Sequence, residues 1–252
     1  MVHRSGASHI GTSLSMSDIL AVLYSGTLRV NPQCPNWPER DRFILSKGHG
    51  AAALYAVLAE TGFFPPSTLT EYCRDGSILT GHVSHKVPGV EVSTGSLGHG
   101  LPIACGMALA GKRDGRPYRV FVVLSDGECD EGSNWEAALF APHHKLDNLI
   151  GIIDYNKIQG FGAVKDVLEL APLADKWRAF RWSVREVDGH NLNELEKDLA
   201  AVPFESGKPS LLVAHTIKGK GVAFMENLLA WHYKSPDGPQ LERALRELGC
   251  EP

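Results

Sequence analysis

The sequence predicts an α/β protein built on a doubly wound, mainly parallel sheet with helices on both faces. Two central segments, residues 119–124 and 149–153, are continuous apolar runs apart from Arg119 at the first position, which is typical of strands that are buried on both faces of a sheet. Residues 134–143, which lie between them, have a helical composition. Because strand and helix patterns alternate in this way along the chain, we expect parallel strands joined by crossover helices.

The other elements are predicted by short apolar runs and by residues that begin or end helices. A first helix is expected through residues 19–24, with Ser15 or Ser17 as its N-terminal cap and Asp18 in its first turn. Further helices are expected at residues 51–60, 101–110, 134–143, 173–180 and 192–202, with a short terminal one after residue 240. The expected strands are residues 43–45, 119–124, 149–153, 182–187 and 211–214. Residues 63–96 and 217–240 are expected to be irregular.

The composition is that of a globular protein, and we expect a single domain, residues 1–252. Hydrophobic residues make up 43% and charged residues 21% of the chain. The formal net charge of −4 argues against a nucleic acid or a membrane surface as a partner. Neither a membrane-spanning segment nor a signal peptide is expected. The five cysteines form no CxxC pair, which suits free thiols in a reducing cytoplasm and not a disulfide framework or a zinc site.

Polar side chains follow the two central strands. Asp126 comes just after the first strand, and Asn156 comes just after the second. Ligands of parallel sheets bind beyond the carboxyl ends of the strands, so both residues are expected to face one site. A carboxylate, a carboxamide and a nearby backbone carbonyl suit Mg²⁺, with a diphosphate and water completing the shell. Gly127 would let a phosphate approach closely, although an Asp-Gly pair alone also fits a simple strand-to-helix turn.

Glycine stands beside histidine at four places in the chain. These places are Gly48-His49-Gly50, Gly81-His82, Gly98-His99-Gly100 and Gly189-His190. A glycine lets the backbone approach a ligand while the neighbouring side chain reaches it. Turns that carry surface histidines are the alternative interpretation of each pair. Four such pairs together favour a binding role for some of them.

Several motifs agree in order and spacing with one protein family. The segment around the strand ends reads SDGECDEGSNWEAALFAPHHKLDNLIGIIDYNKI. The other motifs are SHIGTSLSMSDIL, LSKGHGAAALYA, LTGH, STGSLGHGL and HTIKGKGVAFMEN, followed by WH. The chain resembles the transketolase family over nearly its whole length, and the long segment is similar to that family's thiamine-diphosphate motif. Ser125 departs from the motif, because it stands in place of its first glycine.

The resemblance implies that thiamine diphosphate binds at the strand ends with Mg²⁺, or with another divalent cation such as Ca²⁺. The implied metal ligands are Asp126, Asn156 and the carbonyl of Ile158. The implied contacts of the diphosphate are Gly127 and His49. The implied contacts of the pyrimidine and thiazolium rings are Gly95 and Leu97.

The resemblance also implies a set of catalytic side chains. Four histidines match those that surround the reacting carbon and the donor's hydroxyls in transketolases: His9, His49, His82 and His232. Two carboxylates, Glu131 and Glu136, match those that meet their symmetry mates at a dimer interface and couple the two active sites. Outside this motif context, lone histidines and glutamates would be interpreted as surface residues.

The implied reaction transfers a two-carbon ketol unit from a ketose, by default a pentose phosphate, to an aldose acceptor. In full-length transketolases a second α/β domain supplies the pyrimidine pocket and the glutamate that activates the coenzyme. No segment after Leu211 is long enough to form that domain. We therefore expect a separate partner subunit with a pyrimidine-binding domain, most simply in an α₂β₂ heterotetramer.

Three alternatives remain beside this interpretation. Another thiamine-diphosphate enzyme, a 2-oxo acid decarboxylase or dehydrogenase subunit, would share the diphosphate motif, although the histidines suit a polyhydroxylated donor better. A nicotinamide-dependent dehydrogenase would also be α/β, but its GxGxxG motif after the first strand is missing. The third alternative is a non-catalytic regulatory subunit that binds the coenzyme or only a partner, and the presence of both metal ligands and the histidines argues against it.

Overall fold

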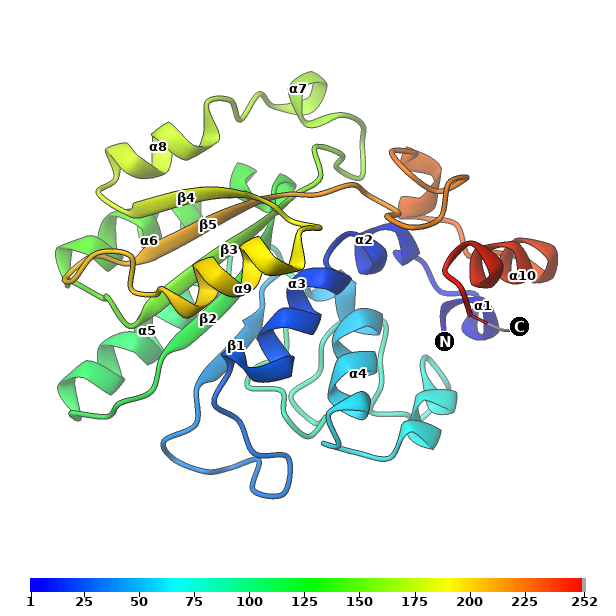
Figure 1. Ribbon diagram of the computed structural model, residues 1–252, viewed down its shortest axis with the longest axis horizontal. Coiled ribbons are helices and arrows are strands. Elements are labelled where there is room, and N and C mark those ends of the chain that lie inside the picture. Colours follow the sequence, from blue (N-terminus) through cyan, green and yellow to red (C-terminus); the bar gives the residue numbers. More distant parts are fainter. Residues whose placement is uncertain (251–252) are drawn as a thin grey trace.

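The computed structural model describes residues 1–250 and contains a five-stranded sheet whose paired strands are all parallel (Figure 1). The strands are β1 (Arg42–Leu45), β2 (Val120–Ser125), β3 (Leu149–Tyr155), β4 (Ser183–Asp188) and β5 (Ser210–His215). Their order across the sheet is β1-β2-β3-β5-β4. Each strand lies where the sequence predicts one, with ends that differ by a few residues. The predicted parallel sheet is therefore confirmed.

Helices cover both faces of this sheet, which confirms the doubly wound fold. The helices of one face are α3 (Ser17–Val22), α4 (Ala51–Glu60) and α9 (Leu192–Ala200). The helices of the other face are α5 (Gly100–Arg113), α6 (Gly132–His143) and α8 (Leu173–Ala179). Successive strand residues point to opposite faces, so Phe121 packs with the first group and Val122 with the second. Every residue of β2 is buried, which explains its uninterrupted apolar sequence.

The first helical region differs from its prediction. The chain forms α2 (Ile10–Ser15) before α3, with Met16 between them, and α3 continues into a π-helical turn at Leu23–Thr27. The predicted cap is wrong, because no side chain caps α3. The Ser17 hydroxyl instead donates a hydrogen bond of 2.8 Å to the carbonyl of Ser13 in the preceding helix. Helical structure thus begins well before the serines that were expected to start it.

The remaining elements are three helices and a set of 3₁₀ turns. The remaining helices are α1 (Val2–Ser5), α7 (Val164–Val167) and α10 (Gly238–Glu247). The 3₁₀ turns are Gly48–Gly50, Pro66–Glu71, Gly127–Asp130 and Leu229–His232. Helix α10 lies beside α1 in Figure 1, and His3 Nδ1 donates a hydrogen bond of 2.7 Å to the Pro236 carbonyl. The two terminal segments therefore pack together.

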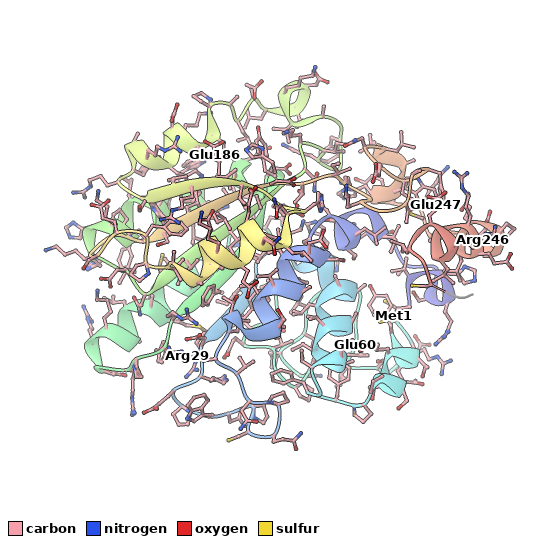
Figure 2. All side chains as sticks on the ribbon, in the orientation of Figure 1. Met1, Arg29, Glu60, Glu186, Arg246 and Glu247 are labelled. Carbon is pink, nitrogen blue, oxygen red and sulfur yellow. The ribbon has the colours of Figure 1, made fainter. Side chains whose placement is uncertain are left out.

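Most charged side chains lie on the outside of the molecule. Figure 2 labels several of them, among them Glu60, Glu186 and Arg246, which are all exposed. Within residues 1–250, no helix combines the length and the apolar character needed to cross a membrane.

Candidate active site

A polar cavity of about 390 Å³ lies at the carboxyl ends of β2 and β3. It brings together segments that are far apart in the sequence, from the start of α2 to the 3₁₀ turn before Tyr233. Every residue predicted for the site except Glu136 lines it, namely His9, His49, His82, Gly95, Leu97, Asp126, Gly127, Glu131, Asn156, Ile158 and His232. Glu136 lies on α6 with its side chain exposed and is not part of the cavity wall.

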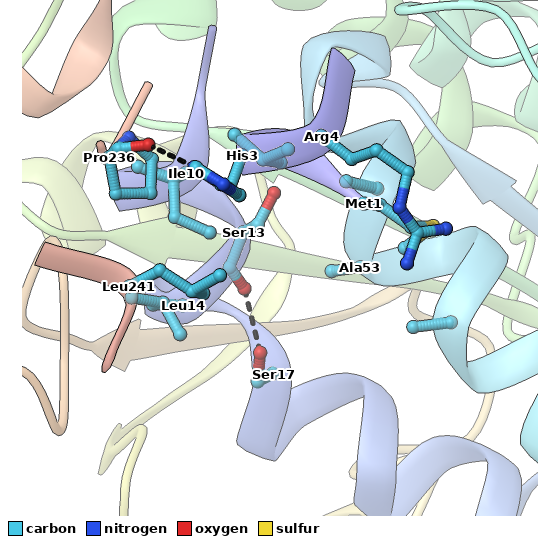
Figure 3. Close-up of a pocket in the computed structure, with 13 residues that line it drawn as sticks. Met1, His3, Arg4, Ile10, Ser13, Leu14, Ser17, Ala53, Pro236 and Leu241 are labelled. Carbon is cyan, nitrogen blue, oxygen red and sulfur yellow. Dashed lines mark hydrogen bonds between the residues drawn. The ribbon is translucent and has the colours of Figure 1, made fainter. Parts of the chain in front are cut away.

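A second cavity, of about 290 Å³, lies between α1, α2, α4 and the start of α10 (Figure 3). Its wall is largely aliphatic, with Ile10, Leu14, Ala53 and Leu241 among the lining residues. It contains no carboxylate, and the only histidine in its wall, His3, is already bonded through Nδ1 to a backbone carbonyl. Catalytic chemistry is therefore better placed in the polar cavity.

Four histidines from four separate segments meet in the polar cavity. His9 stands before α2, His49 lies in the 3₁₀ turn after β1, His82 lies in the loop that follows α4, and His232 ends the 229–232 turn. The ring centre of His9 lies 5.2 Å from that of His49, 6.0 Å from that of His82 and 5.0 Å from that of His232. The His9 amide also donates to the His232 carbonyl at 3.0 Å. The cluster is thus held by backbone as well as by side-chain packing.

Burial and nearby positive charge keep three of these rings neutral, those of His9, His49 and His232. Burial, the neighbouring His82 and the ammonium groups of Lys218 and Lys47 lower the pKa of His9 to about 4. Burial, followed by Lys218, lowers the pKa of His232 to about 3. The pKa of His49 falls well below its ordinary value for the same reasons, burial first and Lys47 second. At neutral pH each of these rings therefore has one N–H donor and one acceptor nitrogen.

The predicted metal ligands offer one carboxylate, one carboxamide and one carbonyl. Asp126 Oδ1 accepts from the Gly127 amide at 2.7 Å, and its Oδ2 accepts from the Lys157 amide at 2.5 Å. Asn156 Oδ1 accepts from the Ile158 amide at 3.1 Å. Burial, together with the neighbouring carboxylate of Asp154, raises the pKa of Asp126 to about 6. Hard oxygen donors of this kind fit a magnesium ion.

A lysine faces the third of these ligands. The ammonium of Lys218 donates to the Ile158 carbonyl at 2.9 Å and lies 2.8 Å from His232 Nδ1. Lys218 is almost fully buried, and burial followed by the charge of Lys47 lowers its pKa to about 8. Among residues 1–250, no three His, Cys, Asp or Glu side chains form a group that could hold a metal, but the predicted set needs only one such side chain.

Sequence reasoning gave no role to the buried ion pair beneath the site. The ammonium of Lys47, just after β1, contacts the carboxylate of Asp154 in β3, and both side chains are fully buried. Ser15 Oγ donates to Asp154 Oδ1 at 2.6 Å, and Thr216 Oγ1 also donates to it. Burial alone would raise the pKa of Asp154, but Lys47 and these hydroxyls hold it below its ordinary value. Ser15 also accepts from Asn156 Nδ2 at 3.2 Å, so this network fixes a predicted metal ligand.

Two glycines of the cavity wall have identifiable reasons to be glycine. Gly95 has a φ of 154°, and a Cβ there would lie 3.0 Å from the His82 ring. A Cβ on Gly127 would lie 2.9 Å from the side chain of Gln159. Gln159 in turn donates to Asp130 at 2.9 Å. Gln159 was missed by the sequence interpretation, since no local pattern marks its approach to the Asp-Gly turn.

Comparison with known proteins identifies the family of this chain. Residues 1–252 match the family described as "Transketolase, thiamine diphosphate binding domain". The chain belongs to the transketolase family. The fold and the family that the sequence motifs predict are thereby confirmed.

The most informative transketolase relatives are subunits of similar length. The chain is 44% identical over 247 residues to the 6-deoxy-6-sulfo-D-fructose transketolase subunit SqwG of Clostridium sp. (strain MSTE9), covering 98% of this chain and 90% of that protein. It is 47% identical over 244 residues to an apulose-4-phosphate transketolase subunit of Actinobacillus succinogenes, covering 96% of this chain and 88% of that protein. The chain thus corresponds to one subunit of a transketolase, and relatives of this kind imply a separate partner subunit.

Solved transketolases are much longer than this chain. It superposes on the transketolase of Campylobacter jejuni with a TM-score of 0.93 and 31% sequence identity, covering 99% of this chain and 40% of that one. The transketolase of Leishmania mexicana gives the same score and identity, with 39% of its chain covered. The chain therefore spans about 40% of the length of the solved transketolases that it matches.

Proposed function

We propose that this subunit, together with its partner, transfers a two-carbon ketol unit from a ketose to an aldose acceptor, using thiamine diphosphate and Mg²⁺. The observation that carries the proposal is the polar cavity at the strand ends. It places the oxygen donors of the predicted metal ligands and a cluster of four histidines in one space. Thiamine diphosphate has an anionic diphosphate at one end and a reacting ring at the other. It therefore needs metal ligands for the first and side chains that bind the substrate near the second.

Asp126, Asn156 and the Ile158 carbonyl would hold the metal, and Gly127 and His49 would contact the diphosphate. All five line the same cavity. The donor set is that of Mg²⁺, which usually takes one or two protein side chains and fills its shell with phosphate oxygens and water. Lys218 would have to share the Ile158 carbonyl with the metal or move from it, and its positive charge would then face the diphosphate.

The histidines would bind and orient the sugar. When bound, thiamine diphosphate supplies the carbon that attacks the ketose and the electron sink for the bond that breaks. Neutral imidazoles can donate one hydrogen bond and accept another, so His9 and His232 can hold hydroxyl groups without adding charge. A ring of this kind can also accept a proton from a donor hydroxyl as the carbon–carbon bond breaks. The ring of His82 lies 6.0 Å from that of His9 and would contact the same sugar. His49 would contact the diphosphate and would also help to orient the sugar, since its ring lies 5.2 Å from that of His9 and 6.0 Å from that of His232.

The substrate is proposed to be an anionic ketose. The two subunit relatives described above are named for 6-deoxy-6-sulfo-D-fructose and for apulose 4-phosphate, and both compounds carry an acidic group. The group that recognises this charge would lie largely on the partner subunit, which is also proposed to supply the pyrimidine pocket. The proposed assembly is an α₂β₂ heterotetramer in the cytoplasm, with Glu131 and Glu136 at the interface between two copies of this chain.

Reconstitution tests the shared active site. The chain and its partner are assayed separately and together for ketol transfer from ketose phosphates, with 2-oxo acid decarboxylation as a second assay. We expect transfer only from the mixture, and no decarboxylation. Robust transfer by this chain alone would contradict the two-subunit proposal, and decarboxylation without transfer would contradict the reaction.

Substitution of the metal ligand tests the site. Asp126→Ala should abolish Mg²⁺-dependent binding of thiamine diphosphate, measured by calorimetry, while the circular dichroism spectrum stays unchanged because the residue lies on a strand-end turn. Asp175→Ala, which removes an exposed carboxylate from α8, is the matched control. Equal coenzyme affinity in the two variants would remove Asp126 from the site.

A further inference from the structure

A fully buried carboxylate beside the candidate site has no part in the proposed function. Glu128 lies in the 3₁₀ turn at Gly127–Asp130, and none of its surface is exposed. Its side chain does not line the cavity. Burial of a carboxylate is costly unless hydrogen-bond donors compensate for the lost water, so the donors around Glu128 indicate what it does.

Three donors from three different segments converge on this carboxylate. The Gly98 amide donates to Oε1 at 2.9 Å, and the hydroxyl of Ser46, just after β1, donates to the same oxygen. The Ser125 amide, at the end of β2, donates to Oε2 at 3.3 Å. Ser46 Oγ also accepts from the Gly100 amide at 3.1 Å. Glu128 therefore joins the ends of two strands to the segment that precedes α5.

The serine that departs from the family motif belongs to this arrangement. Ser125 Oγ accepts from the Glu128 amide at 3.2 Å, while the Ser125 amide donates to the Glu128 side chain. The two residues thus bond to each other in both directions. A glycine at position 125 would lack the hydroxyl that fixes the Glu128 backbone. Ser125 and Glu128 are therefore a matched pair in this chain.

Gly98 is held from its other side as well. The hydroxyl of Ser133, at the start of α6, donates to the Gly98 carbonyl at 2.7 Å. Gly98 has a φ of 83°, and a Cβ there would lie 2.6 Å from both Glu131 Cβ and Ser133 Oγ. Both polar backbone groups of this glycine are thus bound by side chains, in a conformation that few other residues adopt. The segment 95–98, which supplies Gly95 and Leu97 to the cavity wall, is anchored at this point.

We propose that Glu128 and Ser133 are positioning residues, which hold segment 95–98 as the wall against which the rings of the coenzyme rest. This inference depends on the proposed function, since that function is what gives Gly95 and Leu97 a coenzyme to contact. Neither residue touches the coenzyme. They fix the distance between the ring wall and the Asp126–Gly127 turn, so that the diphosphate end and the ring end fit one molecule at once.

Two probes separate positioning from general support of the fold. Thiamine diphosphate occupies both ends of the cavity, whereas inorganic pyrophosphate occupies only the diphosphate end. Each of these two ligands, in the presence of MgCl₂, is titrated into the reconstituted two-subunit enzyme. The enzyme is the wild type or carries Glu128→Gln, Ser133→Ala or the control Tyr118→Phe. The control is closely matched to Ser133→Ala, because each change removes one hydroxyl that donates to a backbone carbonyl. The Tyr118 hydroxyl donates to the Met107 carbonyl at 3.0 Å, and neither of these residues lines the cavity.

We expect Glu128→Gln to raise the dissociation constant of thiamine diphosphate about tenfold, because the amide keeps one acceptor oxygen and replaces the other with an NH₂ group, which donates. Ser133→Ala should raise it by a smaller factor, and Tyr118→Phe should leave it unchanged. The affinity for pyrophosphate should stay at the wild-type value in all three. If Ser133→Ala matches the control, or if both ligands weaken equally, the positioning role is refuted. Failure of the wild-type enzyme to bind thiamine diphosphate would instead refute the proposed function.

Discussion

Removal of the Lys47 ammonium should be one of the most damaging single changes in this chain. Lys47→Met keeps most of the volume of the side chain but leaves the Asp154 carboxylate buried without its cation. Loss of one member of a buried ion pair typically costs about 3–5 kcal/mol of unfolding free energy. The hydroxyls of Ser15 and Thr216 still donate to Asp154, so the lower part of this range is expected.

The sign of its pH dependence follows from the two pKa shifts. In the wild type the pKa of Asp154 lies below its ordinary value. The ion pair therefore contributes its full stability at pH values above the ordinary pKa of an aspartate, and this contribution is lost as the pH falls through the pKa of the folded state. In Lys47→Met the hydroxyls of Ser15 and Thr216 still lower the pKa of Asp154, but burial, the largest cause, is no longer opposed by the cation and raises it. The variant therefore loses stability as the pH rises, and the gap to the wild type should widen between about pH 5 and about pH 8.

Urea unfolding of the two proteins at both pH values measures this effect. Lys112→Met is the matched control, because Lys112 pairs with Asp147 at 2.6 Å while both side chains are partly exposed, and such pairs are worth about 0–1 kcal/mol. The double variant Lys47→Met/Asp154→Asn should be more stable than Lys47→Met at neutral pH, since it buries no uncompensated charge. An equal cost for Lys47→Met and Lys112→Met, or a gap that does not change with pH, would refute the reasoning.

Three further outcomes are expected. Magnesium affinity should rise as the pH rises through about 6, the raised pKa of Asp126, with binding about tenfold weaker at pH 5 than at pH 7; calorimetry that shows no pH dependence would contradict this. Lys218→Met should tighten Mg²⁺ binding about tenfold in the absence of coenzyme, because the ammonium no longer competes for the Ile158 carbonyl; unchanged affinity would mean that the two share that oxygen. Gly48→Ala should lower the unfolding free energy by about 1–3 kcal/mol, since its Cβ would lie 2.5 Å from the Thr94 carbonyl carbon; urea unfolding with a wild-type midpoint would show that the loop yields freely.

The sequence predicted the sheet well because each strand carries its own signal. The run from Val120 to Leu124 is apolar at every position and is followed by polar residues, so both the strand and the place of Asp126 can be inferred locally. Helix starts are less well marked. Ser15 and Ser17 have the side chains of N-terminal caps, yet helical structure begins earlier, at Ile10, since the packing of the whole segment outweighs a capping preference.

The candidate site was predictable only in part. Motif resemblance named the residues of the cavity wall, but it gave no role to the contacts beneath that wall. Lys47 and Asp154 are 107 positions apart, and Lys218 lies 60 positions from the carbonyl that it contacts. No periodicity or spacing connects residues so distant, because only the folded sheet brings the ends of separate strands together. The same reason hid the bond between Glu128 and Gly98, which spans 30 positions.

In the proposed site, the charges that line the cavity would make metal and coenzyme binding mutually dependent. Lys47 and Asp154 cancel each other, while the ammonium of Lys218 and the carboxylates of Asp126, Asp130 and Glu131 belong to residues that line the cavity. Lys218 would repel a divalent cation that arrives alone, and the carboxylates would repel a diphosphate that arrives alone. Each ligand would neutralise the charge that opposes the other, so their binding would be cooperative. By thermodynamic linkage, magnesium would then strengthen coenzyme binding by the same factor by which the coenzyme strengthens magnesium binding.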